Sequence, residues 1–130
     1  MPDMGFAPFS QFGINTYGTS LITSQAVIDA DPDLVRRFVH ASAQGWEAAI
    51  KDPQAAVQAT MKQFPESDPN LLREGLKVMI DQQLHTPATA GKPIGWTAEG
   101  DWTAMLERLK NYSGLKPKHP SDYYTNGFID

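Results

Sequence analysis

The sequence predicts a helix-rich α/β chain with one main strand, and three observations support this. Residues 13–23 are rich in β-branched and aromatic side chains, the composition of a strand. Asp-Pro pairs occur at 31–32, 52–53 and 68–69, and each is typical of a helix start. No second run of clear strand character accompanies the first. The strand therefore lacks an evident partner in this chain.

Length and composition narrow the class of protein. The 130 residues are enough for one domain, and a hydrophobic content of 41% indicates a packed core rather than disorder. The 11 Lys+Arg are outnumbered by 15 Asp+Glu and form no basic run, which excludes an electrostatic surface for nucleic acid. The sequence contains no cysteine, so disulfides, thiolate nucleophiles and cysteine-ligated metals are excluded. It shows neither a secretory signal nor an apolar span of about 18–20 residues.

The first elements follow from local composition. Residues 1–12 are expected to form a loop or extended entry, and the strand at 13–23 is expected to bend at Gly18. A short helix at 24–30 follows, capped by Ser24.

The three Asp-Pro pairs predict three consecutive helices. The aspartate accepts a hydrogen bond from an unpaired helix N–H, and the proline loses nothing at the first helical position. The expected helices span residues 32–51, 53–64 and 69–85. The first carries an apolar stripe spaced at three and four, made of Leu34, Val35, Phe38, Val39, Ser42, Gly45, Trp46, Ala49 and Ile50.

The remaining chain is predicted to contain one more helix. Residues 86–95 form a loop rich in Pro, Gly and Thr, and a helix follows at 98–112, capped by Thr97. Gly114 stands where a left-handed residue ends a helix. Residues 115–130 are expected to form a basic loop and a short aromatic turn.

A single strand cannot satisfy its own backbone donors and acceptors. Two explanations are open for how the predicted strand obtains a hydrogen-bonding partner. Either a second copy of the chain pairs with the strand, or the rest of the sheet lies upstream in sequence.

The residues that could carry chemistry are scattered. His40, His85 and His119 have no metal-ligand spacing, and neither a nucleophile elbow nor a phosphate-binding glycine loop is present. Glu99 and Asp101 are interpreted as first-turn charges of a helix. We therefore predict no catalytic residue, no metal site and no cofactor.

The aromatic residues divide into two groups. Phe38, Trp46 and Trp102 have helical spacing and are expected to pack in a core. Tyr17 lies on the predicted strand beside Asn15, Thr16 and a glycine, where a ring and polar groups could bind a small molecule. A core role for Tyr17 on the strand is an equal alternative.

Several segments together resemble the C-terminal part of NMT1/THI5-like substrate-binding proteins of ABC transporters. They are Gly13-Ile-Asn-Thr-Tyr-Gly-Thr-Ser-Leu-Ile-Thr-Ser24, residues 31–39, Gly45-Trp46-Glu47-Ala48-Ala49, residues 52–57, Ile94-Gly95-Trp96 and residues 122–129. The resemblance spans nearly the whole chain, from about residue 8 to residue 129. It rests on the order and spacing of the segments, because no single motif is diagnostic.

The resemblance implies a periplasmic-binding-protein-like (type II) α/β fold, of which this chain is the C-terminal portion. Residues 1–23 would form a loop and the return strand between two lobes, and residues 24–130 would pack as helices on the first lobe. Asn15, Thr16 and Tyr17 would contact a ligand in the cleft between the lobes. The upstream portion, with much of that cleft, is expected to be missing, so binding by this chain would be impaired.

The function implied is non-covalent capture of a small molecule for an ABC importer. The full-length protein would be periplasmic, would engage the permease and would need no cofactor. Relatives of this kind bind nitrate, sulfonates, taurine or thiamine-pyrimidine precursors, and the sequence does not choose among these ligands. One alternative is a thiamine-pyrimidine-precursor biosynthesis enzyme of the same fold. Another is a small helical protein that forms a homodimer through its strand or helix faces.

Overall fold

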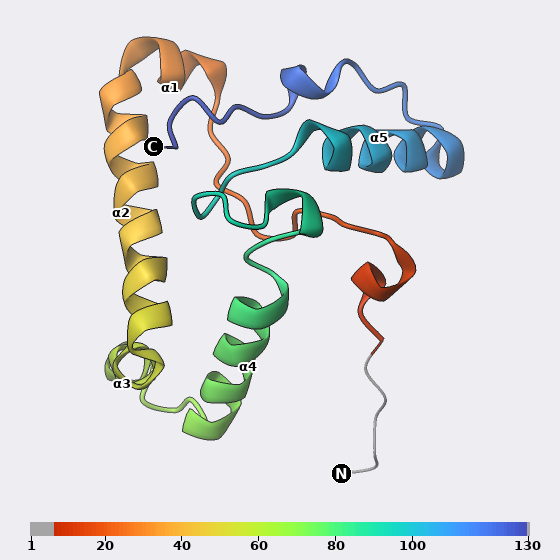
Figure 1. Cartoon of the computed structure of the whole chain (residues 1–130). Coiled ribbons are helices and arrows are strands. Elements are labelled where there is room, and N and C mark those ends of the chain that lie inside the picture. The colour runs from red at the N-terminus through yellow and green to blue at the C-terminus, as the bar shows by residue number, and fades with distance from the viewer. Residues whose placement is uncertain (1–6, 130) are drawn as a thin grey trace. The chain divides into compact units, whose positions relative to one another are not determined.

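The structure of the protein is a computed structural model, and it describes residues 7–129. Within that range, the α-helices are α1 (Gln25–Ala30), α2 (Pro32–Lys51), α3 (Pro53–Gln63), α4 (Pro69–Gln82) and α5 (Glu99–Ser113) (Figure 1). Short 3₁₀ turns occur at η1 (Phe9–Phe12), η2 (Pro87–Thr89) and η3 (Pro120–Asp122). The predicted order of helices is confirmed, and the fourth ends at Gln82, three residues before its expected end.

The predicted helix starts have the expected geometry. Ser24 caps α1 by accepting a hydrogen bond from the backbone N–H of Val27. Asp31, Asp52 and Asp68 cap α2, α3 and α4 in the same way, each followed by a proline at the first helical position. Each side chain satisfies a backbone donor that has no partner within the helix. The Asp-Pro pairs therefore determine where these helices begin.

Replacing Asp52 with alanine is expected to lower the free energy of unfolding by about 1 kcal/mol. The Asp52 carboxylate accepts a hydrogen bond of 3.0 Å from the Ala55 N–H at the start of α3, and alanine cannot. Urea unfolding followed by circular dichroism measures the change. Asp81→Ala is the matched control, because Asp81 makes only an exposed ion pair with Lys77, worth about 0.3–0.5 kcal/mol. Equal losses in the two variants would contradict the capping role.

The strand predicted at residues 13–23 is absent. Among residues 7–129 no strand is formed, and residues 14–23 are neither helical nor sheet-paired. The α/β class with one main strand is therefore not confirmed. The physical reason is that β-branched composition favours an extended backbone, but a strand exists only when a neighbouring strand supplies hydrogen bonds.

Two further expectations are corrected. The residue at the N-cap of α5 is Ala98, not Thr97, and the Ala98 side chain makes no capping hydrogen bond. Phe38 is 60% exposed rather than part of a core, whereas Trp46 and Trp102 are half-buried. Gly114 has the expected left-handed conformation after α5, with a φ of 67°.

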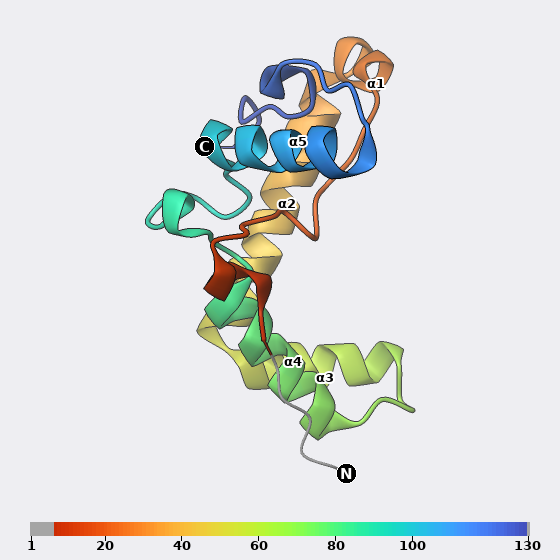
Figure 2. The same ribbon diagram turned by 90° about the vertical axis from the view of Figure 1, so that its right-hand side faces the viewer.

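The chain divides into two structural units. The first unit combines the N-terminal residues up to Thr19 with Thr97–Thr125, and it contains η1, α5 and η3. In this unit the chain turns back after α5, so that η3 packs beside the helix (Figure 2). Leu106 of α5 is its one buried hydrophobic residue among those described.

The second unit comprises Ser20–Trp96 and Asn126–Asp130, and it contains α1 to α4. Within it, α3 contacts both α2 and α4. The helices α2 and α4 are connected at one end through α3 (Figure 1). Val57 of α3 is the only buried hydrophobic residue among the described residues of this unit. Most apolar side chains of α1 to α4 therefore remain partly open to solvent.

Candidate functional site

The predicted ligand-contact segment belongs to the first unit, where Tyr17 lies against the N-terminal end of α5. The Tyr17 hydroxyl donates to the Asp101 carboxylate, with an Oη–Oδ2 distance of 2.8 Å. The same oxygen accepts a hydrogen bond of 2.8 Å from the Ala98 N–H. The Ala98 N–H belongs to the helix end that no side chain of α5 caps, so Tyr17 supplies part of the cap from a distant segment.

Asp101 has a role that the sequence did not reveal. It lies in the first turn of α5, as expected for an acidic residue near a helix N-terminus. It is also 9% exposed and accepts the Tyr17 hydroxyl. An aspartate in a first helical turn is usually solvated, and no sequence signal marks this one as buried.

The other two predicted ligand residues are not held by side-chain hydrogen bonds or ring contacts with other described residues as Tyr17 is. Thr16 is exposed and Asn15 is half-buried. A second link to α5 lies close by, because Arg108 donates through Nη2 to the Gly13 carbonyl oxygen at 3.1 Å. The segment is therefore attached to α5 at residues 13 and 17, on either side of Asn15 and Thr16. The structure places Asn15, Thr16 and Tyr17 together; their contact with a ligand stays a prediction.

Tyr17 also belongs to an aromatic cluster, which we define as Tyr17, Trp102, Tyr123 and Tyr124. The ring centroids of Tyr17 and Trp102 are 5.9 Å apart. Trp102 stacks nearly parallel on Tyr124, at 5.4 Å and 6°, and on Tyr123, at 6.4 Å and 10°. Offset stacks of this kind add to the free energy gained by burying the rings. The cluster connects residue 17, α5 and the C-terminal aromatic turn within one unit.

The pKa of Tyr124 is raised above its ordinary value of 10.0. The larger cause is burial, which disfavours the phenolate, and the smaller cause is the negative charge of Glu99. In the folded protein Tyr124 therefore keeps its proton at a pH where the unfolded chain would lose it.

This raised pKa predicts an alkaline loss of stability. The contribution of Tyr124 is fully present below the unfolded pKa and declines as the pH rises from 10.0 through the folded pKa. Tyr124→Phe removes the ionisable group, so the free energy of unfolding of this variant will fall less steeply across that range. Urea unfolding at a series of alkaline pH values measures both slopes. Equal slopes for the variant and the unchanged protein would contradict the assignment.

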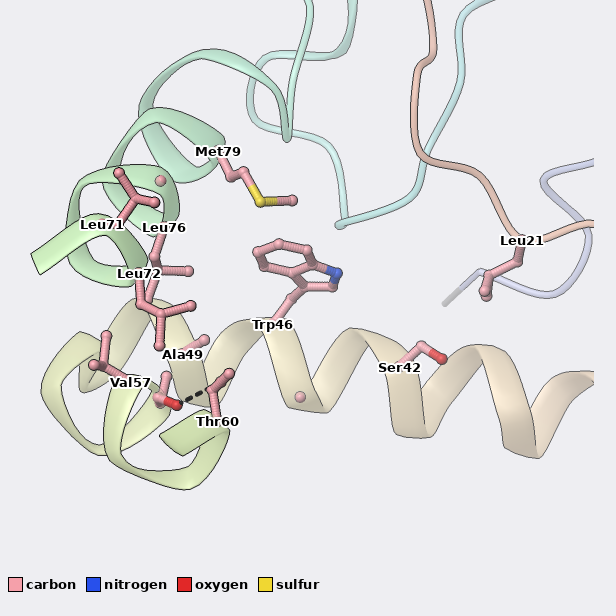
Figure 3. A pocket seen from close by; sticks show the side chains of 13 residues that line it. Leu21, Ser42, Trp46, Ala49, Val57, Thr60, Leu71, Leu72, Leu76 and Met79 are labelled. Carbon is pink, nitrogen blue, oxygen red and sulfur yellow. Dashed lines mark hydrogen bonds between the residues drawn. The ribbon is translucent and has the colours of Figure 1, made fainter. Parts of the chain in front are cut away.

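The second unit contains a groove between α2, α3 and α4, with a volume of about 600 Å³ (Figure 3). Trp46 projects from α2 into the groove, facing Leu72, Leu76 and Met79 of α4. The lining is mostly apolar, and it consists of Leu21, Ser42, Gly45, Trp46, Ala49, Ala56, Val57, Thr60, Leu71, Leu72, Gly75, Leu76 and Met79. The sequence predicts the apolar stripe of α2 but not the groove, because the relative placement of the three helices depends on α3.

Among residues 7–129, no group of His, Asp or Glu side chains is arranged to hold a metal ion. None of the helices in that range combines the length and apolar character needed to cross a bilayer.

The class of protein is indicated by a family comparison. Residues 2–56 match the sequence model of the family described as NMT1/THI5 like. The matched range includes the candidate ligand residues, α1 and α2. The family has a periplasmic-binding-protein-like fold. The resemblance to NMT1/THI5-like proteins is therefore confirmed.

One relative is more specific. The riboflavin-binding protein RibY of Chloroflexus aurantiacus is 28% identical over 119 residues, which are 88% of this chain and 34% of RibY. The chain thus spans about a third of the length of the curated relative it matches. No solved structure matches the chain significantly.

Proposed function

We propose that this chain is part of a solute-binding protein of an ABC importer, and that the protein captures a small molecule without covalent chemistry. The observation that carries the proposal is the family match over residues 2–56, because that range includes Asn15, Thr16 and Tyr17. The name of the relative, a riboflavin-binding protein, supports binding rather than catalysis.

In this proposal the complete protein has two lobes and holds its ligand between them. Ligand favours the closed arrangement of the lobes, and the permease recognises that form. Residues 1–23 form the return segment between the lobes, and the helices from residue 24 onward pack on the first lobe. Leu34 and Phe38 of α2, 47% and 60% exposed, are suitable contacts for that packing. The protein is periplasmic in its full-length form.

The attachment of residues 13 and 17 to α5 supports a positioning role for that helix. Ligand-contact groups bind best when their backbone is held in place before the ligand arrives. The hydrogen bonds of Tyr17 with Asp101 and Ala98 hold one end of the segment. Asn15 can then present its amide, a donor and acceptor, to a polar ring edge.

Riboflavin is the first ligand to test. Isothermal titration calorimetry with riboflavin would compare the 130-residue chain with a longer product, the protein encoded by the longest open reading frame that contains this sequence. The longer product is expected to bind riboflavin, and the 130-residue chain much more weakly, because part of the cleft is missing. Asn15→Ala in the longer product should weaken binding about 3- to 10-fold through loss of one hydrogen bond. Tyr112→Phe, at an 89% exposed position, is the control.

Other results would contradict the proposal. If the longer product binds neither riboflavin nor nitrate, sulfonates, taurine or a thiamine pyrimidine, it is not a binding protein of this kind. Conversion of a pyrimidine precursor, or self-modification in the presence of iron, would favour the biosynthetic enzyme instead.

A further inference from the structure

We propose that Arg108 is a positioning residue, which holds Asn15 and Thr16 in place for a ligand without touching the ligand itself. It lies about two turns beyond Asp101 on α5 and belongs to the same structural unit as residues 13–17. The inference rests on the proposed function for its ligand. It adds a residue that lies outside the predicted ligand contacts.

The segment formed by residues 13–17 is attached to α5 at both of its ends. The Tyr17 hydroxyl donates to Asp101 and accepts from the Ala98 N–H at the start of the helix, both at 2.8 Å. The Gly13 carbonyl accepts from Nη2 of Arg108 at 3.1 Å, much nearer the end of the helix. The segment therefore runs along α5 in the direction opposite to the helix.

The segment has little slack between these two attachments. Asp101 and Arg108 are seven residues apart in the helix, which is about 10 Å along its axis. Four residues of fully extended chain span at most about 14 Å, and the chain from Gly13 to Tyr17 has a similar distance to cover. Without the Arg108 attachment, the segment is held at Tyr17 alone and its other end is free to leave α5.

Gly13 gives the Arg108 attachment a defined geometry. It ends η1 in a left-handed conformation with a φ of 71°, and its N–H donates to the Ser10 carbonyl at 3.1 Å. The N–H of Ile14 donates to the Phe9 carbonyl, also at 3.1 Å. The carbonyl that Arg108 holds is therefore part of a hydrogen-bonded turn. The attachment thus fixes the direction in which the chain leaves that turn.

Asn15 and Thr16 depend on the two attachments for their position. Neither residue forms a hydrogen bond with another described residue, so their side chains and peptide groups are available to a ligand. A segment of this kind loses conformational freedom when it binds, and that loss weakens the affinity. Restraint at both ends removes part of this freedom before the ligand arrives.

A second feature of Arg108 separates positioning from a purely structural role. Its Nη1 is buried and has no hydrogen-bond partner among the described residues, and a buried donor without a partner is destabilising. Replacing Arg108 with methionine loses the bond to Gly13 but also removes this unpaired donor. The two effects on stability oppose each other, so the fold should be retained while the segment loosens.

Backbone NMR relaxation of the 130-residue chain without ligand tests the attachment. In Arg108→Met, the order parameters at Asn15 and Thr16 are expected to fall from about 0.85 to below about 0.6, with the helical circular dichroism retained. Lys110→Met is the matched control, because it removes the same charge from an exposed position on the same helix. Unchanged order parameters in Arg108→Met, or an equal fall in Lys110→Met, would overturn the proposal.

A second variant covers the case in which Arg108→Met loses its helical signal. Arg108→Gln then replaces it, because the glutamine side chain is polar but shorter than that of arginine. The same fall in the order parameters is expected in this variant, and unchanged values would overturn the proposal.

A thermodynamic cycle in the longer product tests whether the position matters to the ligand. Arg108→Met should weaken riboflavin binding about 3- to 10-fold by calorimetry, as much as Asn15→Ala, through which it acts. Once Asn15 is alanine, the further loss on replacing Arg108 should be less than about 2-fold, because the two effects are coupled. A residue that only stabilises the fold would lower the affinity by the same factor in both backgrounds, and that result would overturn the positioning role.

The two measurements separate this inference from the proposed function. A longer product that binds none of the candidate ligands, while Arg108→Met still loosens the segment, would overturn the proposed function and confirm the attachment. A longer product that binds riboflavin, with order parameters that Arg108→Met leaves unchanged, would support the proposed function and overturn the positioning role.

Discussion

Trp102→Ala will lower the free energy of unfolding by about 3 kcal/mol, the lower end of the range for removing a large aromatic side chain. The lower end applies because Trp102 is half-buried rather than fully buried. The substitution removes three ring contacts at once, with Tyr17, Tyr123 and Tyr124. The substitution should therefore destabilise the whole of the first unit.

Urea unfolding followed by circular dichroism measures this change. Tyr123→Ala is the control from the same cluster, because Tyr123 is 43% exposed and stacks only on Trp102 in the cluster. Its substitution should cost about 1 kcal/mol. If the two substitutions cost the same, Trp102 is not the centre of the cluster.

Tyr17→Phe is expected to lower the free energy of unfolding by about 1–3 kcal/mol in the absence of any ligand. Phenylalanine keeps the ring against Trp102 but removes the hydroxyl. The buried Asp101 carboxylate then loses the Tyr17 donor, and the Ala98 N–H loses its acceptor. Tyr112→Phe is the matched control, because its hydroxyl is at an 89% exposed position and its loss should change stability by less than about 0.5 kcal/mol.

This measurement decides between the two interpretations of Tyr17. A residue that serves only to contact ligand would leave stability unchanged when its hydroxyl is removed. A double-mutant cycle with Asp101→Ala adds a sharper test, since directly interacting residues show a coupling energy of about 0.5–3 kcal/mol. A coupling near zero would mean that the hydrogen bond between Tyr17 and Asp101 contributes nothing to folding.

Local signals in the sequence were sufficient for the starts of α1 to α4. Ser24, Asp31, Asp52 and Asp68 cap the helices that they predict, because capping depends on residues a few positions apart. The left-handed turn at Gly114 is equally local. The family resemblance, which rests on the order of short segments, is also a property of the sequence alone and is supported by the match over residues 2–56.

Only the tertiary structure decided three other features: the absence of the strand, the burial of Asp101 and the presence of the groove. Each of them depends on residues far apart in the chain. Residues 13–23 have strand composition, yet a strand requires a neighbour that residues 7–129 do not provide. The burial of Asp101 depends on Tyr17, which lies 84 positions earlier. The groove exists because α3 holds α2 and α4 together. Composition and spacing specify hydrogen bonds between residues a few positions apart. The burial of a side chain and the pairing of a strand depend instead on which distant residues the fold places next to them.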